Sequence, residues 1–200
     1  MIGERHRVRN AEPRERAALA AMLARSFHDD PVMSWFFPDE RRRTDHCRRF
    51  FAMRLRQLLP QGETYTVDGG AGAAIWALPE RWRLGTWEDI RMGLALLPAL
   101  GRRVGLAVRG VELIERAHPR EPHYYLAVLG TDPTAQGQGI GSALLQPVLG
   151  ACDRDEIPAY LESSKERNID FYARHGFRVT GEVHLPEGPP VWSMWREPRP

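Results

Sequence analysis

The stretch Gln136-Gly137-Gln138-Gly139-Ile140-Gly141-Ser142 decides the fold. It follows an apolar run, residues 124–131, that predicts a buried strand, and it precedes a helical pattern that extends to about residue 154. Its alternating glycines let the backbone approach a ligand closely, because no Cβ stands in the way. The unpaired N–H groups and the dipole of the following helix favour an anion at its first turn. The loop is therefore predicted to bind a phosphate or pyrophosphate.

Three classes of phosphate-bearing ligand compete for this loop. A P-loop requires Gly-Lys-Ser/Thr, but here the residues are Ile140-Gly141-Ser142. A dinucleotide fold requires a glycine where Ser142 stands, and an acidic residue at a strand end about 20 positions on, whereas Asp153 and Asp155 come too early. The coenzyme A pattern Gln/Arg-x-x-Gly-x-Gly/Ala is matched by Gln136, Gly139 and Gly141. The alternative is a glycine-rich turn with no ligand.

The composition excludes several other classes of protein. The 200 residues, 42% of them hydrophobic, suffice for one domain with its own core. Residues 1–10 are charged, and the longest apolar run, 94–100, is too short to cross a bilayer, so a cytoplasmic protein is expected. The net charge of +2 does not indicate nucleic-acid binding. Cys47 and Cys152 belong to no ligand cluster, so no disulfide framework and no metal site are expected.

The basic residues are almost all arginine. Lys165 is the only lysine among 28 basic residues, a bias typical of a GC-rich genome. Arginine abundance is therefore not taken as a functional signal.

Hydrophobic patterning outlines strands and helices along the whole chain. Strands are predicted at residues 5–9, 63–67, 71–78, 124–131, 158–162, 177–185 and 191–196. Helices are predicted at residues 13–27, 40–59, 86–97, 104–118, 141–154 and 167–175. Asn10 is expected to cap the first helix, and Val108, Val111, Leu113 and Ile114 are candidate core residues. The chain is predicted to be one mixed α/β (α+β) domain, residues 1–200.

Two blocks of sequence resemble the GNAT superfamily of acetyl-CoA-dependent N-acetyltransferases. Residues 129–145 are similar to the central strand, pyrophosphate loop and helix of that family. Residues 168–177, which contain Asn168, Tyr172 and Gly176-Phe177, are similar to its second signature. The two blocks are specific together, because they occur in family order at family spacing.

A narrower resemblance covers the C-terminal part of the chain. Residues 121–126, 158–164 and 186–192 are similar to the corresponding stretches of puromycin N-acetyltransferase-like actinobacterial members. The family implies a mixed, mostly antiparallel sheet of about seven strands, splayed between two central strands and flanked by helices. Residues 80–118 match no family stretch and are expected to form a helical insertion.

The resemblance also implies how acetyl-CoA would be held. The loop would bind the pyrophosphate through its backbone, and the strand before it would bond the pantetheine amides like an added strand. Asn168 would bond the pantetheine arm, or alternatively cap the short helix that follows it. The cofactor-binding candidates are Leu129, Gly130, Thr131, Gln136, Gly137, Gln138, Gly139, Ile140, Gly141, Ser142 and Asn168.

Two residues are the catalytic candidates. Tyr172 stands at the family position for the acid that protonates the departing thiolate, and its alternative is a core tyrosine. Glu162 ends the strand that faces the cofactor, where it would take a proton from the amine directly or through water. The alternative for Glu162 is a solvated charge at a strand end.

The acceptor wall is expected in the first interhelical loop. Asp29 and Asp30 would recognise a cationic amine, or simply stop a helix. The aromatic residues that either line a pocket or form core are Trp35, Phe36, Phe37, Trp76, Trp82 and Trp87. His118 and His123 flank a proline turn and receive no role.

These residues together predict an enzyme that moves the acetyl group of acetyl-CoA to a primary amine of a small molecule, such as an antibiotic-like amine. The first alternative is acetylation of a protein or peptide. The second is a non-catalytic acyl-CoA-binding module, and the third a structural α/β domain with no ligand. A small-molecule amine is the expected partner, and the chain is expected to be a monomer or homodimer.

Overall fold

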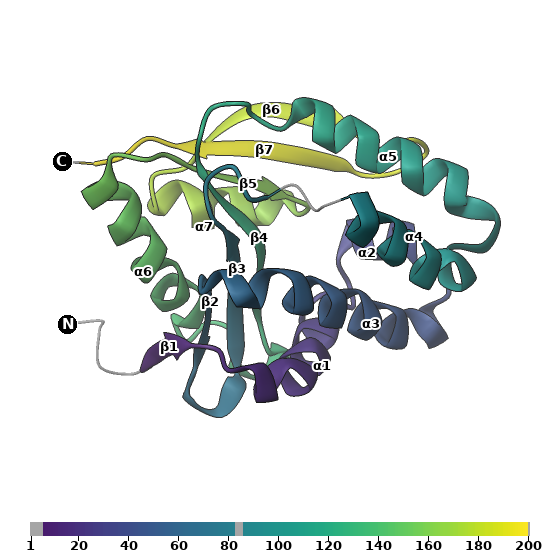
Figure 1. Cartoon of the computed structure of the whole chain (residues 1–200), viewed down its shortest axis with the longest axis horizontal. Helices are drawn as coiled ribbons and strands as arrows, with labels where there is room; N and C mark the ends of the chain where they lie inside the picture. Colours follow the sequence, from purple (N-terminus) through teal and green to yellow (C-terminus); the bar gives the residue numbers. More distant parts are fainter. Residues whose placement is uncertain (1–5, 83–85, 200) are drawn as a thin grey trace.

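The computed structural model describes the backbone of residues 6–82 and 86–199, and the side chains of all of these except 86–92. Its centre, within those ranges, is a seven-stranded mixed sheet in the order β1-β2-β3-β4-β5-β7-β6, flanked by helices (Figure 1). The strands are β1 (Val8–Asn10), β2 (Thr64–Val67), β3 (Gly72–Ala77), β4 (Tyr124–Thr131), β5 (Ala159–Ser163), β6 (Arg178–His184) and β7 (Pro190–Arg196). The α/β architecture predicted from the sequence is confirmed.

The helices follow the predicted segments closely. They are α1 (Arg16–Ser26), α2 (Pro31–Phe36), α3 (Glu40–Leu58), α4 (Thr86–Leu100), α5 (Val104–Ala117), α6 (Ile140–Asp155) and α7 (Ile169–Arg174). The 3-10 turn η6 (Glu166–Asn168) leads into α7. The helices expected within residues 80–118 are present as α4 and α5. Only α2 has no counterpart among the predicted helices.

The sheet splits between its two central strands. β4 and β5 are parallel and pair only from Tyr124 to Leu126, opposite Ala159 to Leu161. Beyond Leu126, β4 continues beside β3, whereas β5 continues beside β7. The two strands therefore part at their C-terminal ends, as the family resemblance implied.

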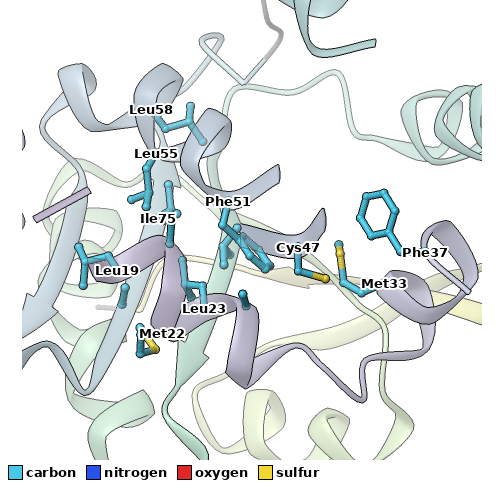
Figure 2. Close-up of a cluster of buried hydrophobic side chains, with 14 of the residues drawn as sticks. Leu19, Met22, Leu23, Met33, Phe37, Cys47, Phe51, Leu55, Leu58 and Ile75 are labelled. Atoms are coloured by element: carbon cyan, nitrogen blue, oxygen red, sulfur yellow. The ribbon is translucent and has the colours of Figure 1, made fainter. Parts of the chain in front are cut away.

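Strand β3 separates two hydrophobic clusters because it is buried on both faces, as the centre of a covered sheet must be. Ala73, Ile75 and Ala77 pack with α1 and α3, and Ala74 and Trp76 pack with α6. Figure 2 shows the first cluster, whose labelled side chains are Leu19, Met22, Leu23, Met33, Phe37, Cys47, Phe51, Leu55, Leu58 and Ile75. Burial of these side chains fixes α1 and α3 on one face of the sheet.

A register shift in β4 reverses the faces of that strand. Val128 pairs with Ile75 and Leu126 pairs with Trp76, which leaves Ala127 as an extra residue. Side chains two apart normally share a face. Leu126 instead packs in the α6 cluster and Val128 in the α1 and α3 cluster. The shift lies where β5 departs from β4, so it coincides with the split of the sheet.

The packing of α5 differs from the sequence prediction. Val108 and Val111 are 53% and 41% exposed, so they are not core residues. The buried residues of α5 are Ala107 and Gly110, and a Cβ at Gly110 would lie 2.6 Å from Trp35. Small residues let α5 approach closely, and of the four predicted core residues Ile114 packs on this side, against the cluster that contains Trp35.

The predicted cap of the first helix is also wrong. The Asn10 side chain donates a hydrogen bond to the Gly62 carbonyl and does not reach the helix. The chain first forms a 3-10 turn, Pro13–Glu15, where the Glu15 carboxylate accepts from the backbone N–H of Glu12 at 2.8 Å.

Both cysteines are free and fully buried, Cys47 in α3 and Cys152 in α6. They pack there as small apolar side chains. Across the described ranges, the helices are too short or too polar to cross a membrane.

Candidate active site

A cavity of about 520 Å³ opens where β4 and β5 separate. One wall is β4 from Leu126 to Thr131, and the facing wall is the end of β5 with the segment that follows, Glu162 to Lys165. The glycine loop, the first turn of α6, part of α7 and the end of α1 complete the lining. The split of the sheet therefore gathers segments that are far apart in the sequence around one space.

The glycine loop lines this cavity, and two of its glycines have backbone angles that other residues adopt only with strain. Gly137 and Gly139 have φ angles of 77° and 84°, and Gly139 directly precedes α6. A Cβ at either position would meet no atom within 4 Å, so the space beside the loop is open. An anion there would meet the free N–H groups at the start of α6, so this backbone fits the pyrophosphate of acetyl-CoA.

The structure places the loop candidates as follows. The residues that line the cavity are Gln136, Gly137, Gly139, Ile140, Gly141 and Ser142. Gln138 is exposed and outside this lining, and its carbonyl accepts a hydrogen bond from His6 at 2.9 Å.

An ion pair holds the entry to the loop. Arg25 of α1 lies 2.6 Å from Asp132, whose carboxylate also accepts from the backbone N–H and the hydroxyl of Thr134. The guanidinium of Arg25 lowers the pKa of Asp132 below its usual range, and the bonds from Thr134 act in the same direction. These contacts hold the first residues of the loop in place between the end of β4 and α1.

Leu129, Gly130 and Thr131 line the cavity from β4, opposite the side that pairs with β3. A Cβ at Gly130 would lie 2.7 Å from Leu23 and 3.0 Å from Phe27. Gly130 is therefore required by the close passage of α1 over the strand, a reason that the sequence alone did not reveal.

Tyr172 and Asn168 reach the cavity from the opposite side. Tyr172 is 8% exposed, and its ring packs against Phe171 and Phe177. Its hydroxyl forms no hydrogen bond with the residues that the structure describes. Burial, with a smaller effect from the charge of Asp30, raises the pKa of Tyr172, so it stays protonated. The Asn168 side chain also lines the cavity and forms no capping bond to α7.

The acceptor candidates from the first loop separate in the structure. Asp30 is 2% exposed, lines the cavity, caps α2 through Val32 and Met33, and accepts a hydrogen bond from Ser164. Asp29 is exposed and does not line it.

Trp35 lies elsewhere. It packs with Leu185 and Val191, and its indole N–H donates to the Pro186 carbonyl at 3.0 Å. It is outside the cavity lining. The side chain of Trp87 falls outside the described residues.

Glu162 lines the cavity, and its side chain is only 10% exposed. Its Oε1 atom lies 3.2 Å from Nδ1 of His118, which comes from the end of the helical insertion, and His118 in turn contacts His123. Sequence reasoning assigned no role to either histidine. The available signal was their position around the turn before β4, whose first residues pair with β5 near Glu162.

Comparison with known proteins now identifies the fold family. Residues 101–179 match the family model of the acetyltransferase (GNAT) domain, and this range contains α5, β4, the glycine loop, α6, β5 and α7. This part of the chain is therefore similar to GNAT acetyltransferase domains. The enzyme class predicted from the sequence, an acetyl-CoA-dependent acetyltransferase, is thereby confirmed.

Similar proteins cover almost the whole chain. An uncharacterized N-acetyltransferase of Schizosaccharomyces pombe is 26% identical over 95% of this chain and 83% of that protein. A crystal structure from Corynebacterium glutamicum, described as histone acetyltransferase HPA2 and related acetyltransferase, has a TM-score of 0.74 at 23% identity and covers 98% of this chain and 97% of that one. The polyamine N-acetyltransferase of Drosophila melanogaster, which forms N-acetylagmatine, has a TM-score of 0.63 at 16% identity and covers 96% and 99%.

Three basic residues that line the cavity were not predicted. Lys165, Arg167 and Arg174 all line the cavity, near the segment that holds Asn168 and Tyr172. Their charges suit the phosphates of coenzyme A. Arginine is so frequent in this chain that its position in the fold, and not its count, carries the signal.

Proposed function

We propose that this GNAT domain, which we take to be residues 1–200 as one unit, transfers the acetyl group of acetyl-CoA to a primary amine of a small molecule. The amine attacks directly while both substrates are bound. We further propose that the chain is a puromycin N-acetyltransferase-like member, on the C-terminal resemblance, and that it acts in the cytoplasm.

One observation carries the proposal: the glycine loop, Tyr172 and Glu162 line the same cavity. Acetyl-CoA supplies an activated thioester. The loop backbone and the free edge of β4 bind its phosphates and amides. Glu162 removes a proton from the ammonium of the acceptor, and Tyr172 donates a proton to the sulfur that leaves. Cofactor binding, deprotonation of the amine and protonation of the leaving sulfur are thus each assigned to residues that line the cavity.

The acidic residues of the cavity support an amine acceptor. Asp30 and Glu162 both line it, and a buried carboxylate attracts a protonated amine more strongly than one in water does. The Drosophila neighbour is a polyamine N-acetyltransferase, which is consistent with an acceptor of this kind. Binding of the charged amine at Asp30 would place its nitrogen beside the two catalytic candidates.

A coenzyme A release assay over a panel of amines tests this function. The panel contains aminonucleosides, aminoglycosides, polyamines and short peptides. Turnover with at least one small amine, lost on Tyr172→Phe, supports the proposal. Turnover with peptides alone would replace the small-molecule acceptor by a protein, and coenzyme A binding without turnover would indicate a binding module.

A further inference from the structure

Two histidines behind Glu162 form a continuous row of hydrogen bonds with it. His118 Nδ1 lies 3.2 Å from Glu162 Oε1, and His118 Nε2 lies 3.0 Å from His123 Nε2. His123 Nδ1 lies 2.6 Å from the carbonyl oxygen of Glu121. His118 and His123 are 7% and 1% exposed, so bulk water does not replace these contacts. All four ring nitrogens are used within the row.

The positions of the hydrogens follow from the chemistry of the partners. A carbonyl oxygen only accepts, so the hydrogen between His123 and Glu121 belongs to His123 Nδ1. Burial lowers the pKa of His123, which keeps that ring neutral and leaves a lone pair on its Nε2. The hydrogen between the two rings is then on His118 Nε2. His118 Nδ1 faces a carboxylate oxygen, and that contact also needs a hydrogen.

If each of the three contacts contains a hydrogen, the side chains of Glu162, His118 and His123 carry three of these hydrogens in total. The row then has no net charge. With one hydrogen fewer the row carries one negative charge. An imidazole lone pair and a carboxylate oxygen would then face each other at 3.2 Å. The geometry therefore matches the state in which Glu162 and His118 hold one proton between them.

The surroundings of His118 suit a ring that becomes positively charged. Trp82 stacks on it with the ring centroids 3.6 Å apart, and the face of an aromatic ring attracts a cation. Tyr160 and Tyr125 meet it edge-on at 4.7 and 4.9 Å. Among the side chains that the structure describes, the other titratable or charged groups around the row are Tyr125, Tyr160, Glu121 and, beside Tyr125, Arg54. Burial and the nearby charge of Glu162 raise the pKa of both tyrosines, so they stay neutral.

We propose that Glu162, His118 and His123 act as one proton-holding unit, in which Glu162 removes the proton of the acceptor and His118 takes it over. This inference rests on the proposed amine acetylation. The geometry is that of the unit after it has taken up a proton, and the step starts from the unit with one hydrogen fewer, as a Glu162 carboxylate beside a neutral His118. In the step, an N–H bond of the ammonium breaks and its electron pair stays on nitrogen. The proton forms an O–H bond on Glu162 and then an N–H bond on His118 Nδ1, which becomes an imidazolium. After the products leave, the unit returns the proton to water through the cavity that Glu162 lines.

In this unit His118 and His123 are positioning residues, because neither lines the cavity. His123 fixes the ring of His118 through its own bond to the backbone of Glu121. His118 accepts the proton from the Glu162 carboxyl group at its Nδ1 atom.

Nuclear magnetic resonance of the imidazole nitrogens tests the hydrogen positions without relying on activity. We expect His123 to carry its hydrogen on Nδ1, and His118 to gain its charge in the same transition that titrates Glu162. In Glu162→Gln the amide N–H fills the contact without a titrating proton, so His118 should stay neutral through that pH range. A bare Nδ1 on His123, or an unchanged titration of His118 in Glu162→Gln, would overturn the proposal.

Kinetics of His118→Gln test the role of the unit in the reaction. We expect kcat/KM at neutral pH to fall by about 10²-fold, the low end of a general-base contribution, and the loss to shrink at high pH because the amine arrives neutral. Acetyl-CoA affinity measured by calorimetry should not change, which also shows that the variant folds. His184→Gln is the matched control, since His184 is exposed on β6.

The outcomes of the two proposals are distinguishable. If wild type acetylates amines and His118→Gln keeps the wild-type pH profile, the relay is wrong. If wild type acetylates nothing, the proposed function fails first, while the resonances still decide the hydrogen positions. If His118→Gln does not fold, the resonances of wild type and Glu162→Gln carry the decision.

Discussion

Replacing Tyr172 with phenylalanine separates catalysis from packing more cleanly than any other change in this site. The substitution keeps the ring, which is 8% exposed and packed against Phe171 and Phe177, and removes only the hydroxyl. Tyr172 lines the cavity, and its hydroxyl forms no hydrogen bond with the described residues, so the loss of the hydroxyl breaks no internal hydrogen bond. Stability and acetyl-CoA affinity should therefore stay close to wild type.

The chemical step should nevertheless slow by roughly 10²- to 10⁴-fold, the usual size of a general-acid contribution. A thiolate is a tolerable leaving group, so we expect the low end of that range. Because the pKa of Tyr172 is raised, the wild-type hydroxyl keeps its proton, and its ionisation should cause no loss of rate below about pH 10.

Tyr124→Phe is the matched control. Tyr124 is also 8% exposed, but its hydroxyl donates to Asp155 at 3.2 Å and lies outside the cavity lining. Removing it should cost about 1 kcal/mol of unfolding free energy and leave the rate unchanged. The two variants are thus expected to show opposite patterns.

Single-turnover rates and thermal melting curves on both variants decide the matter. The reasoning is refuted if Tyr172→Phe turns over at the wild-type rate, because the sulfur would then take its proton from water. It is also refuted if Tyr172→Phe melts early and Tyr124→Phe does not, since Tyr172 would then be a structural residue.

Three further changes test the rest of the site. Gly139→Val forces a side chain onto a backbone with φ of 84° and into the open space beside the loop, so calorimetry should show acetyl-CoA affinity lost; undiminished affinity would remove the loop assignment. Glu162→Gln should lower turnover more at neutral than at high pH, and a constant ratio to wild type across pH would exclude Glu162 as the base. Asp30→Asn keeps a good helix cap but removes the charge, so KM for a cationic amine should rise about tenfold. Asp29→Asn, at an exposed position, should leave KM unchanged, and an equal effect of both variants would argue against recognition by Asp30.

Features that depend on a short, contiguous pattern could be predicted from the sequence. The strand at residues 124–131 and the glycine loop are local, because a strand period and alternating glycines constrain the backbone directly. The structure has β4 at Tyr124–Thr131, and Gly137 and Gly139 have positive φ. The positions of Tyr172 and Glu162 followed from the family resemblance.

Features that depend on packing between distant segments could not be predicted. Periodicity placed Ile114 correctly in the packed side of α5 but also named Val108 and Val111, which are exposed, and it did not indicate that Gly110 lies against Trp35. The row from Glu162 to His123 joins residues from the helical insertion, the turn before β4 and β5, and no local pattern links them. The difference between Asp29 and Asp30 is a matter of which side chain caps α2.

The split between β4 and β5 leaves an unpaired strand edge inside the protein. Beyond Leu126, the backbone of β4 has a neighbouring strand on the β3 side only. An edge of this kind at the surface would recruit strands of other molecules and promote aggregation. Here the unpaired edge of β4 lines a cavity of about 520 Å³, together with residues of α1, α7 and the glycine loop. The part of the strand that could pair with other chains is thus set within a recess that a linear chain of amides can enter.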